Sequence, residues 1–155
     1  RLHRRIDAFS NQLAGIRRSC NRFPAELRRF APVFVDVVAD HLLARSWERH
    51  HPDALPAFSA AAYAAIDLHA FHLPDPGRRF LHHARTHDLF ARYGEQGTLY
   101  GALTAVARRL ERASLAESVI TAVETAMPEL AGDFDEYFPE LVAHASGWLE
   151  THGYR

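Results

Sequence analysis

Apolar side chains recur every three or four residues along nearly the whole chain, and this spacing is the strongest constraint on its fold. A period of 3.6 residues places such side chains on one face of an α-helix. No segment alternates apolar and polar residues as a half-buried strand requires. The sequence therefore predicts an all-α protein of about seven helices. We expect a single domain over residues 1–155, because 48 % apolar residues in a chain of this length can enclose one substantial core.

Prolines, glycines and serines mark the breaks in the helical pattern. The expected helices span about residues 2–20, 24–48, 59–72, 78–93, 97–112, 114–127 and 134–151. Ser59 is an expected N-cap, because its hydroxyl can accept a hydrogen bond from a first-turn amide. His41 falls in the apolar stripe of the second expected helix. Asp133, Asp135 and Glu136 are expected at the solvated start of the last helix, where negative charge is favourable.

Composition excludes several classes of protein. A formal net charge of −1 gives no general basic surface for nucleic acid, and no apolar run approaches the roughly 20 residues that span a bilayer. Cys20 is the only cysteine, so the chain is not a disulfide scaffold. All 18 basic residues are arginine, which excludes a Schiff-base or P-loop lysine. We expect a cytoplasmic protein that binds neither nucleic acid nor membranes, and no motif assigns an enzymatic activity.

Two stretches resemble the bacterial globins found in flavohaemoglobins and their single-domain relatives. Residues 51–58 resemble the family motif H-P-E-x-x-P-x-F, with Phe58 at the position of the phenylalanine that packs on the haem. Residues 72–76 resemble the H-L-D-D-P turn, and Gly94 and Tyr100 follow at the family's spacing. The resemblance covers about residues 24–112. It implies a globin-like domain with an additional helix at each end.

This resemblance implies a haem cofactor that binds a diatomic ligand, senses it or carries out redox chemistry at iron. Phe90 stands where the family has its proximal histidine. His87, one helical turn earlier, is therefore the expected iron ligand, and His83 is the second candidate. At 100° per residue, His87 lies within about 40° of the apolar face that includes Phe80. His69 is expected on the distal side of the haem.

The expected cofactor-binding residues are Phe58, His69, Phe80, His83, His87, Phe90 and Tyr100, of which His87, His83 and His69 are expected to bind iron. Leu43 and Ile66 are expected to shape an apolar distal pocket. A histidine on an apolar helix face also fits a purely structural role, with its ring bonded to a carbonyl group.

Two further functions remain open at this point. Phe90 at the ligand position and a short distal helix favour a haem-free globin-like module that senses or binds a small apolar ligand or a protein partner. The spacing of His69 and His72, and of His83 and His87, favours a non-haem metal site completed by acidic neighbours at positions 67 or 75. The additional terminal helices suggest a homodimer, or a fused or partner reductase or signalling domain.

Overall fold

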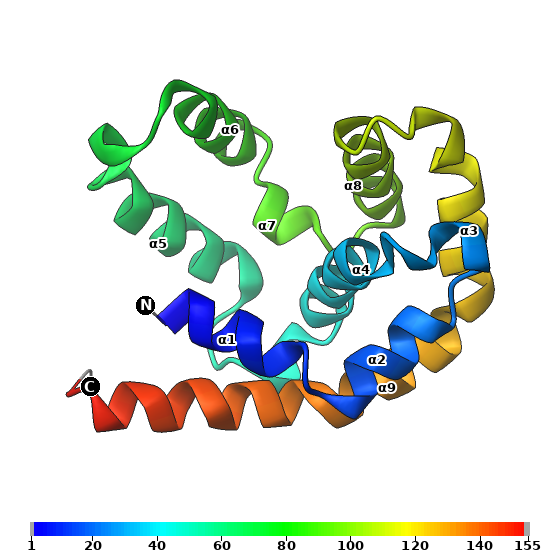
Figure 1. Cartoon of the computed structure of the whole chain (residues 1–155). Coiled ribbons are helices and arrows are strands. Elements are labelled where there is room, and N and C mark those ends of the chain that lie inside the picture. Colours follow the sequence, from blue (N-terminus) through cyan, green and yellow to red (C-terminus); the bar gives the residue numbers. More distant parts are fainter. Residues whose placement is uncertain (1, 154–155) are drawn as a thin grey trace. The chain divides into compact units, whose positions relative to one another are not determined.

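The computed structural model describes residues 2–153, apart from the side chain of residue 3, and every regular element among them is helical (Figure 1). The all-α expectation is confirmed. The α-helices in this range are α1 (Leu2–Ser10), α2 (Ala14–Asn21), α3 (Ala25–Arg28), α4 (Ala31–Arg45), α5 (Leu55–Asp67), α6 (Asp75–Thr86), α7 (Leu89–Arg92), α8 (Gln96–Arg109) and α9 (Ala116–Thr151). Three short 3-10 helices are η1 (Trp47–Arg49), η2 (Ala70–His72) and η3 (Ala113–Leu115).

The chain divides into two compact units by its internal contacts. Unit 1 contains residues 1–39 and 103–155, and unit 2 contains residues 40–102. The expectation of a single domain over residues 1–155 stays a prediction. None of the helices in the described range is both long and apolar enough to cross a membrane.

In unit 1, α1 and α2 lie along α9 (Figure 1). The approach of α2 to α9 is tight at Gly15, where an added Cβ would lie 3.0 Å from the Cβ of Tyr137. Glycine therefore allows α2 to sit against α9 at a distance that a larger residue does not permit. Phe134 and Val123, also on α9, are buried on this helix.

Helix α9 is continuous where the sequence predicts two helices, 114–127 and 134–151, so that prediction is wrong. Pro128 and Pro139 both lie inside the helix. Each proline removes one backbone hydrogen bond, and α9 changes direction along its length rather than ending (Figure 1). Because the helix does not begin near residue 134, Asp133 lies in its middle and is buried, not solvated at an N-terminus as expected.

In unit 2, α7 contacts both α5 and α6, and a buried cluster of Tyr63, Leu81 and Ala84 joins α5 to α6. The helix predicted over 78–93 is interrupted after α6. Asp88 adopts the left-handed conformation with φ 45°, which aspartate tolerates better than most residues. Ser59 is not an N-cap: it is buried inside α5, and its hydroxyl donates a hydrogen bond to the carboxylate of Asp88.

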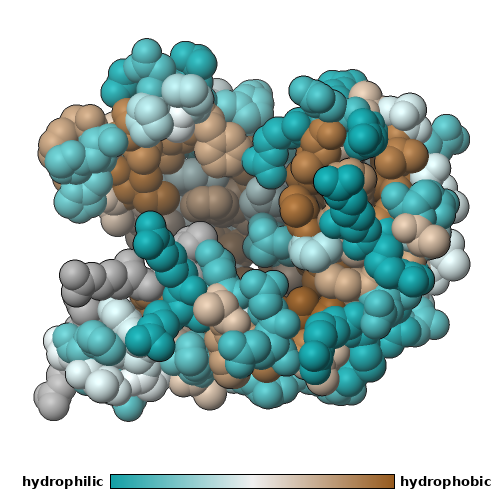
Figure 2. Space-filling model, in the orientation of Figure 1, coloured by the Kyte–Doolittle hydropathy of each residue, from teal (hydrophilic) through white to brown (hydrophobic). Residues whose placement is uncertain are grey.

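Large apolar side chains are exposed mainly on unit 2. Leu68 and Phe71 are 73 % and 71 % exposed, and Phe80 is 59 % exposed. Brown apolar surface is visible over the α5 and α6 region at the upper left of Figure 2. Phe80 therefore projects toward solvent, although the sequence pattern predicts it on the inner face of its helix.

Candidate functional site

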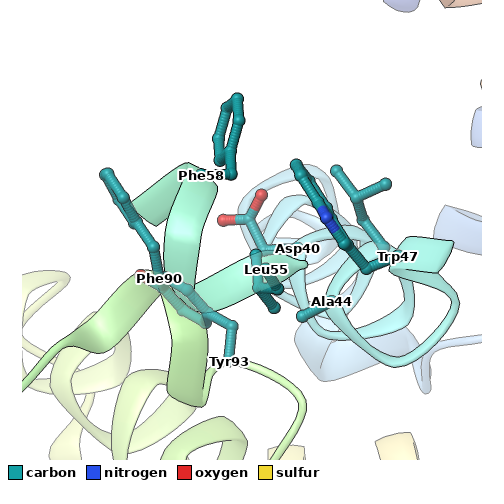
Figure 3. A pocket seen from close by; sticks show the side chains of 8 residues that line it. Asp40, Ala44, Trp47, Leu55, Phe58, Phe90 and Tyr93 are labelled. Carbon is teal, nitrogen blue, oxygen red and sulfur yellow. The ribbon is translucent and has the colours of Figure 1, made fainter. Parts of the chain in front are cut away.

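Unit 2 contains a pocket of about 210 Å³ whose wall is almost entirely apolar or aromatic. It is formed by the end of α4, η1, the first turn of α5 and α7. The lining residues are Asp40, Leu43, Ala44, Trp47, Leu55, Phe58, Phe90 and Tyr93. Figure 3 shows the carboxyl group of Asp40 surrounded in the view by the aromatic rings. Asp40 is the one acidic side chain among these lining residues, so it is the candidate for chemistry at the pocket.

One part of the wall is an aromatic cluster around Trp47. Its ring centroid lies 4.7 Å from that of Phe58 and 5.2 Å from that of His51. The indole Nε1 donates a 2.8 Å hydrogen bond to the carbonyl oxygen of Asp53. This bond ties Trp47 to the segment before α5, so the ring is held in place without a ligand.

A second part of the wall depends on a hydrogen-bonded tyrosine behind it. The ring of Phe90 stacks on the ring of Tyr63 at 4.6 Å with an angle of 4° between their planes. The Tyr63 hydroxyl donates to the carbonyl of Ala84 at 3.0 Å and accepts from the amide of Phe90 at 3.2 Å. The side chain and the backbone of Phe90 are thus both fixed by one buried residue.

His41 lies next to Asp40 in the chain and is only 2 % exposed. Its Nδ1 is 2.8 Å from the carbonyl oxygen of Tyr93, a residue of the pocket wall. A carbonyl only accepts, so Nδ1 carries the proton and a neutral ring has its lone pair on Nε2. Burial lowers the pKa of His41 and the nearby Arg45 charge lowers it further, against the opposing effect of the Tyr93 hydrogen bond. His41 is therefore a neutral imidazole near pH 7.

Asp40 and His41, adjacent on α4, both have side chains that can act as a base or as a metal ligand. A carboxylate oxygen and a neutral imidazole nitrogen can each take a proton or bind a divalent cation. Two donors alone are fewer than a closed metal centre uses. Over the described part of the chain, no group of three histidine, cysteine, aspartate or glutamate side chains is arranged to hold a metal ion.

Comparison with known proteins identifies the family. A family model described as acyl carrier protein phosphodiesterase matches residues 1–141. The chain belongs to this family. Proteins named acyl carrier protein phosphodiesterase from Serratia proteamaculans and Salmonella dublin are 29 % and 30 % identical over 145 and 149 residues. These alignments cover 93 % and 94 % of this chain, and 75 % and 76 % of the relatives.

A relative of the same name from Escherichia coli K12 is 28 % identical over 148 residues, which are 94 % of this chain and 76 % of that protein. No solved structure matches the chain.

Membership of the acyl carrier protein phosphodiesterase family overturns the globin resemblance and the haem function that it implies. Haem binding, diatomic-ligand binding and sensing are wrong, as is the alternative of a haem-free globin-like module. The resemblance was carried by short motifs at residues 51–58 and 72–76. In this fold the first motif forms the entry to α5, and the second forms the turn before α6.

The residues expected around a haem are not brought together in the structure. Phe58 and Phe90 line the pocket of unit 2, as does Leu43, whereas His69, Phe80, His83, His87 and Tyr100 are not among its lining residues. Tyr100 accepts a hydrogen bond from Gln96 within α8. His87 is the C-cap of α6 and not part of a continuous helix, which changes the direction projected for it.

The non-haem metal site is also overturned. The rings of His83 and His87 lie 4.5 Å apart, but no acidic side chain completes a group of three with them in the described structure. Asp67, the first acidic candidate, forms an ion pair with Arg85. The acidic residue at position 75 is paired with the arginine at 78. Both carboxylates are thus already neutralised by guanidinium groups.

Sequence reasoning missed Asp40 and His41. The periodic pattern includes His41 among apolar residues, so it was assigned to the core of a helix. An available signal was the adjacent pair itself, an acid and a histidine inside an otherwise apolar stretch from residue 37 to residue 44. The chain contains ten other histidines, and the sequence alone does not distinguish this buried ring from them.

Proposed function

We propose that this chain hydrolyses a phosphodiester carried by an acyl carrier protein. The observation that carries the proposal is the family match over residues 1–141, supported by relatives of that name that align over more than nine-tenths of the chain. The protein partner of the enzyme is then an acyl carrier protein. The products of hydrolysis are a phosphomonoester and an alcohol.

The pocket of unit 2 supplies groups suited to this reaction. Water that attacks phosphorus must lose a proton, and the departing oxygen must gain one. The Asp40 carboxylate at the pocket is our candidate to accept the proton of the attacking water. His41, neutral and with its lone pair on Nε2, is the neighbouring group that can relay a proton or, with Asp40, contribute to binding a cation.

The test is the mass of an acyl carrier protein before and after incubation with the purified chain. The carrier should bear its phosphodiester-linked prosthetic group, and the reaction should be run with and without added Mg²⁺ or Mn²⁺. We expect the carrier to lose the mass of the group and a phosphomonoester to appear. A carrier without the group is the control substrate and should keep its mass.

A chain that is folded by circular dichroism and leaves the loaded carrier intact in every buffer would contradict the proposal. A small diester, bis(p-nitrophenyl) phosphate, separates general phosphodiesterase chemistry from recognition of the carrier. We expect a much lower kcat/KM for the small diester, because it lacks the protein partner that supplies binding energy.

A further inference from the structure

We propose that Ser59 and Asp88 are positioning residues for His41. They hold α7 where the carbonyl group of Tyr93 keeps the proton of the His41 ring on Nδ1. The inference rests on the proposed function, in which the lone pair on Nε2 of His41 relays a proton or contributes to binding a cation. It gives a role in the reaction to two polar side chains that are not among the residues lining the pocket.

The turn between α6 and α7 is the segment that needs this support. Asp88 adopts the left-handed conformation there, with φ 45° and ψ 55°, which is unfavourable for any residue with a side chain. Helix α7 contains only four residues, Leu89–Arg92, and a helix of that length is not stable by itself. The position of α7 therefore depends on its contacts with the rest of unit 2.

Two buried side chains of α5 supply these contacts. Ser59 and Tyr63 lie one helical turn apart and are 0 % and 4 % exposed. The Ser59 hydroxyl donates a hydrogen bond to the carboxylate of Asp88. The Tyr63 hydroxyl accepts a 3.2 Å hydrogen bond from the amide of Phe90. The start of α7 is thus attached to α5 at residues 88 and 90.

The other end of α7 reaches His41. The amide of Arg92 donates to the carbonyl oxygen of Asp88 at 3.1 Å, so residues 88–92 form one closed helical turn. Tyr93 follows directly, and its carbonyl oxygen lies 2.8 Å from Nδ1 of His41. A change of backbone conformation at residue 88 therefore moves the group that selects the His41 tautomer.

The tautomer matters because a neutral imidazole has one lone pair available to a proton or a cation. While Nδ1 donates to the Tyr93 carbonyl, that lone pair stays on Nε2. If the carbonyl group moves away, the proton distributes over both ring nitrogens, and Nε2 carries it for part of the time. A protonated Nε2 neither accepts a proton nor binds a cation. Loss of the contact between Ser59 and Asp88 should therefore slow the reaction while every group of the pocket is still present.

The experiment combines NMR spectra of the imidazole nitrogens in isotope-labelled protein with kinetics on the loaded carrier protein. The His41 signals are assigned by their absence from His41→Gln, and in the wild type they should show the proton on Nδ1. Ser59→Ala should move both His41 nitrogen signals toward values averaged over the two tautomers. It should also lower kcat at least about tenfold and change KM less than twofold, because a group used in the chemical step is misplaced.

Ser19→Ala is the matched control for Ser59→Ala. Ser19 is also a buried serine whose hydroxyl donates to an aspartate carboxylate, that of Asp133, but it belongs to unit 1. Its loss should destabilise the chain and leave the His41 signals and kcat at their wild-type values. A merely structural role of Ser59 would give the same result in both variants.

Asp88→Gly combined with Ser59→Ala should restore the His41 signals and most of kcat. Glycine adopts the left-handed conformation without a steric penalty, and no carboxylate is left without its donor. If Ser59→Ala alone does not fold, Asp88→Asn and Asp88→Ala make an equivalent comparison. Asparagine tolerates this conformation and accepts from Ser59, so it should retain the His41 signals that Asp88→Ala loses.

The two readouts separate failure of this inference from failure of the proposed function. A folded Ser59→Ala protein with the wild-type His41 signals would overturn the positioning role, whatever its activity. Changed His41 signals at unchanged kcat would overturn the role of the tautomer in the reaction. If the wild type does not hydrolyse the carrier, the proposed function fails, and the NMR comparison alone then decides whether Ser59 and Asp88 position His41.

Discussion

Asp133 of unit 1 and Asp40 of unit 2 lie in different surroundings, and the difference indicates a structural role for the first and a candidate chemical role for the second. Asp133 of unit 1 is 3 % exposed and accepts hydrogen bonds from Ser19, Arg18 and Arg22. Asp40 of unit 2 is exposed at the wall of an apolar pocket. A buried carboxylate with its acceptor sites occupied stabilises a fold, whereas an accessible one beside a cavity can meet a substrate.

The electrostatics of Asp133 agree with a structural role. Burial by itself raises the pKa of the Asp133 carboxyl, but the hydrogen bonds from Arg22, Arg18 and Ser19 together outweigh burial and leave it below the usual value of 3.8. The carboxylate therefore stays ionised in the folded state. It joins Ser19 of α2, one helical turn from Gly15, to α9.

The largest expected effect on stability is the loss of this carboxylate. Asp133→Ala should lower the free energy of unfolding by about 2–3 kcal/mol, because Ser19 is left buried without its acceptor and two guanidinium groups lose their partner. The value is below that for a fully buried pair because side chains of Arg18 and Arg22 are 45 % and 31 % exposed. Urea denaturation of wild type and Asp133→Ala measures this loss in the free energy of unfolding.

Glu136→Gln is the matched control for Asp133→Ala. Glu136 also pairs with Arg18, but its side chain is 67 % exposed. Exposed ion pairs contribute little, so the urea midpoint should not move measurably. Equal effects of the two substitutions would contradict the distinction between the buried and the exposed carboxylate.

A smaller loss is expected in unit 2 from Tyr63→Phe. This change removes one hydroxyl and leaves the Ala84 carbonyl and the Phe90 amide without their partner. The free energy of unfolding should fall by about 1–2 kcal/mol. Tyr100→Phe, which removes the hydroxyl at a more exposed site on α8, should cost less than about 0.5 kcal/mol, and the reverse order would refute the role given to Tyr63.

The packing of α2 on α9 can be tested with a pair of glycines. Gly15→Ala should destabilise unit 1 by about 1 kcal/mol, because the clash with Tyr137 exceeds the gain in helix propensity. An added Cβ at Gly132 meets no atom within 4 Å. Gly132→Ala should therefore stabilise α9 by up to about 1 kcal/mol, and thermal melting of both variants should show shifts of opposite sign.

The smallest effect is a pH dependence that arises from His41. Its pKa is lowered from 6.5 in the folded chain, mainly by burial, so the unfolded chain binds more protons as the pH falls below 6.5. Stability should decrease from pH 7 to pH 5.5. In His41→Gln this decrease should be smaller by up to about 1 kcal/mol. Urea titrations at the two pH values that give identical decreases would show that the ring is not buried and neutral.

The sequence predicts the helical class correctly because the 3.6-residue apolar period indicates helices even where their exact boundaries are misplaced. The sequence does not predict helix boundaries correctly where they depend on contacts between residues that are distant in the chain. Ser59 resembles an N-cap, but in the structure its hydroxyl is used by Asp88, 29 residues later. Pro128 resembles a helix terminator, yet α9 continues through it with its buried residues in place on both sides.

The candidate site was predictable only in part. Phe58 and Phe90 were expected to bind a haem and Leu43 to shape an apolar distal pocket, and all three line the pocket of unit 2. Asp40 and His41 were not selected, because their roles depend on the approach of Tyr93 from α7's C-terminal end. Periodicity indicates which face of a helix is apolar. It does not indicate that the carbonyl group of Tyr93, 52 residues later, fixes the tautomer of His41.

The most direct test of the account is the rate at which Asp40→Asn cleaves the phosphodiester of a loaded acyl carrier protein. Removing the charge of the proposed base should lower kcat at least about 100-fold with little change in the urea midpoint. Glu48→Gln, which neutralises an exposed carboxylate on η1, is the control and should retain the wild-type rate. An Asp40→Asn protein that is folded and as active as wild type would contradict the assignment of the chemistry to this pocket.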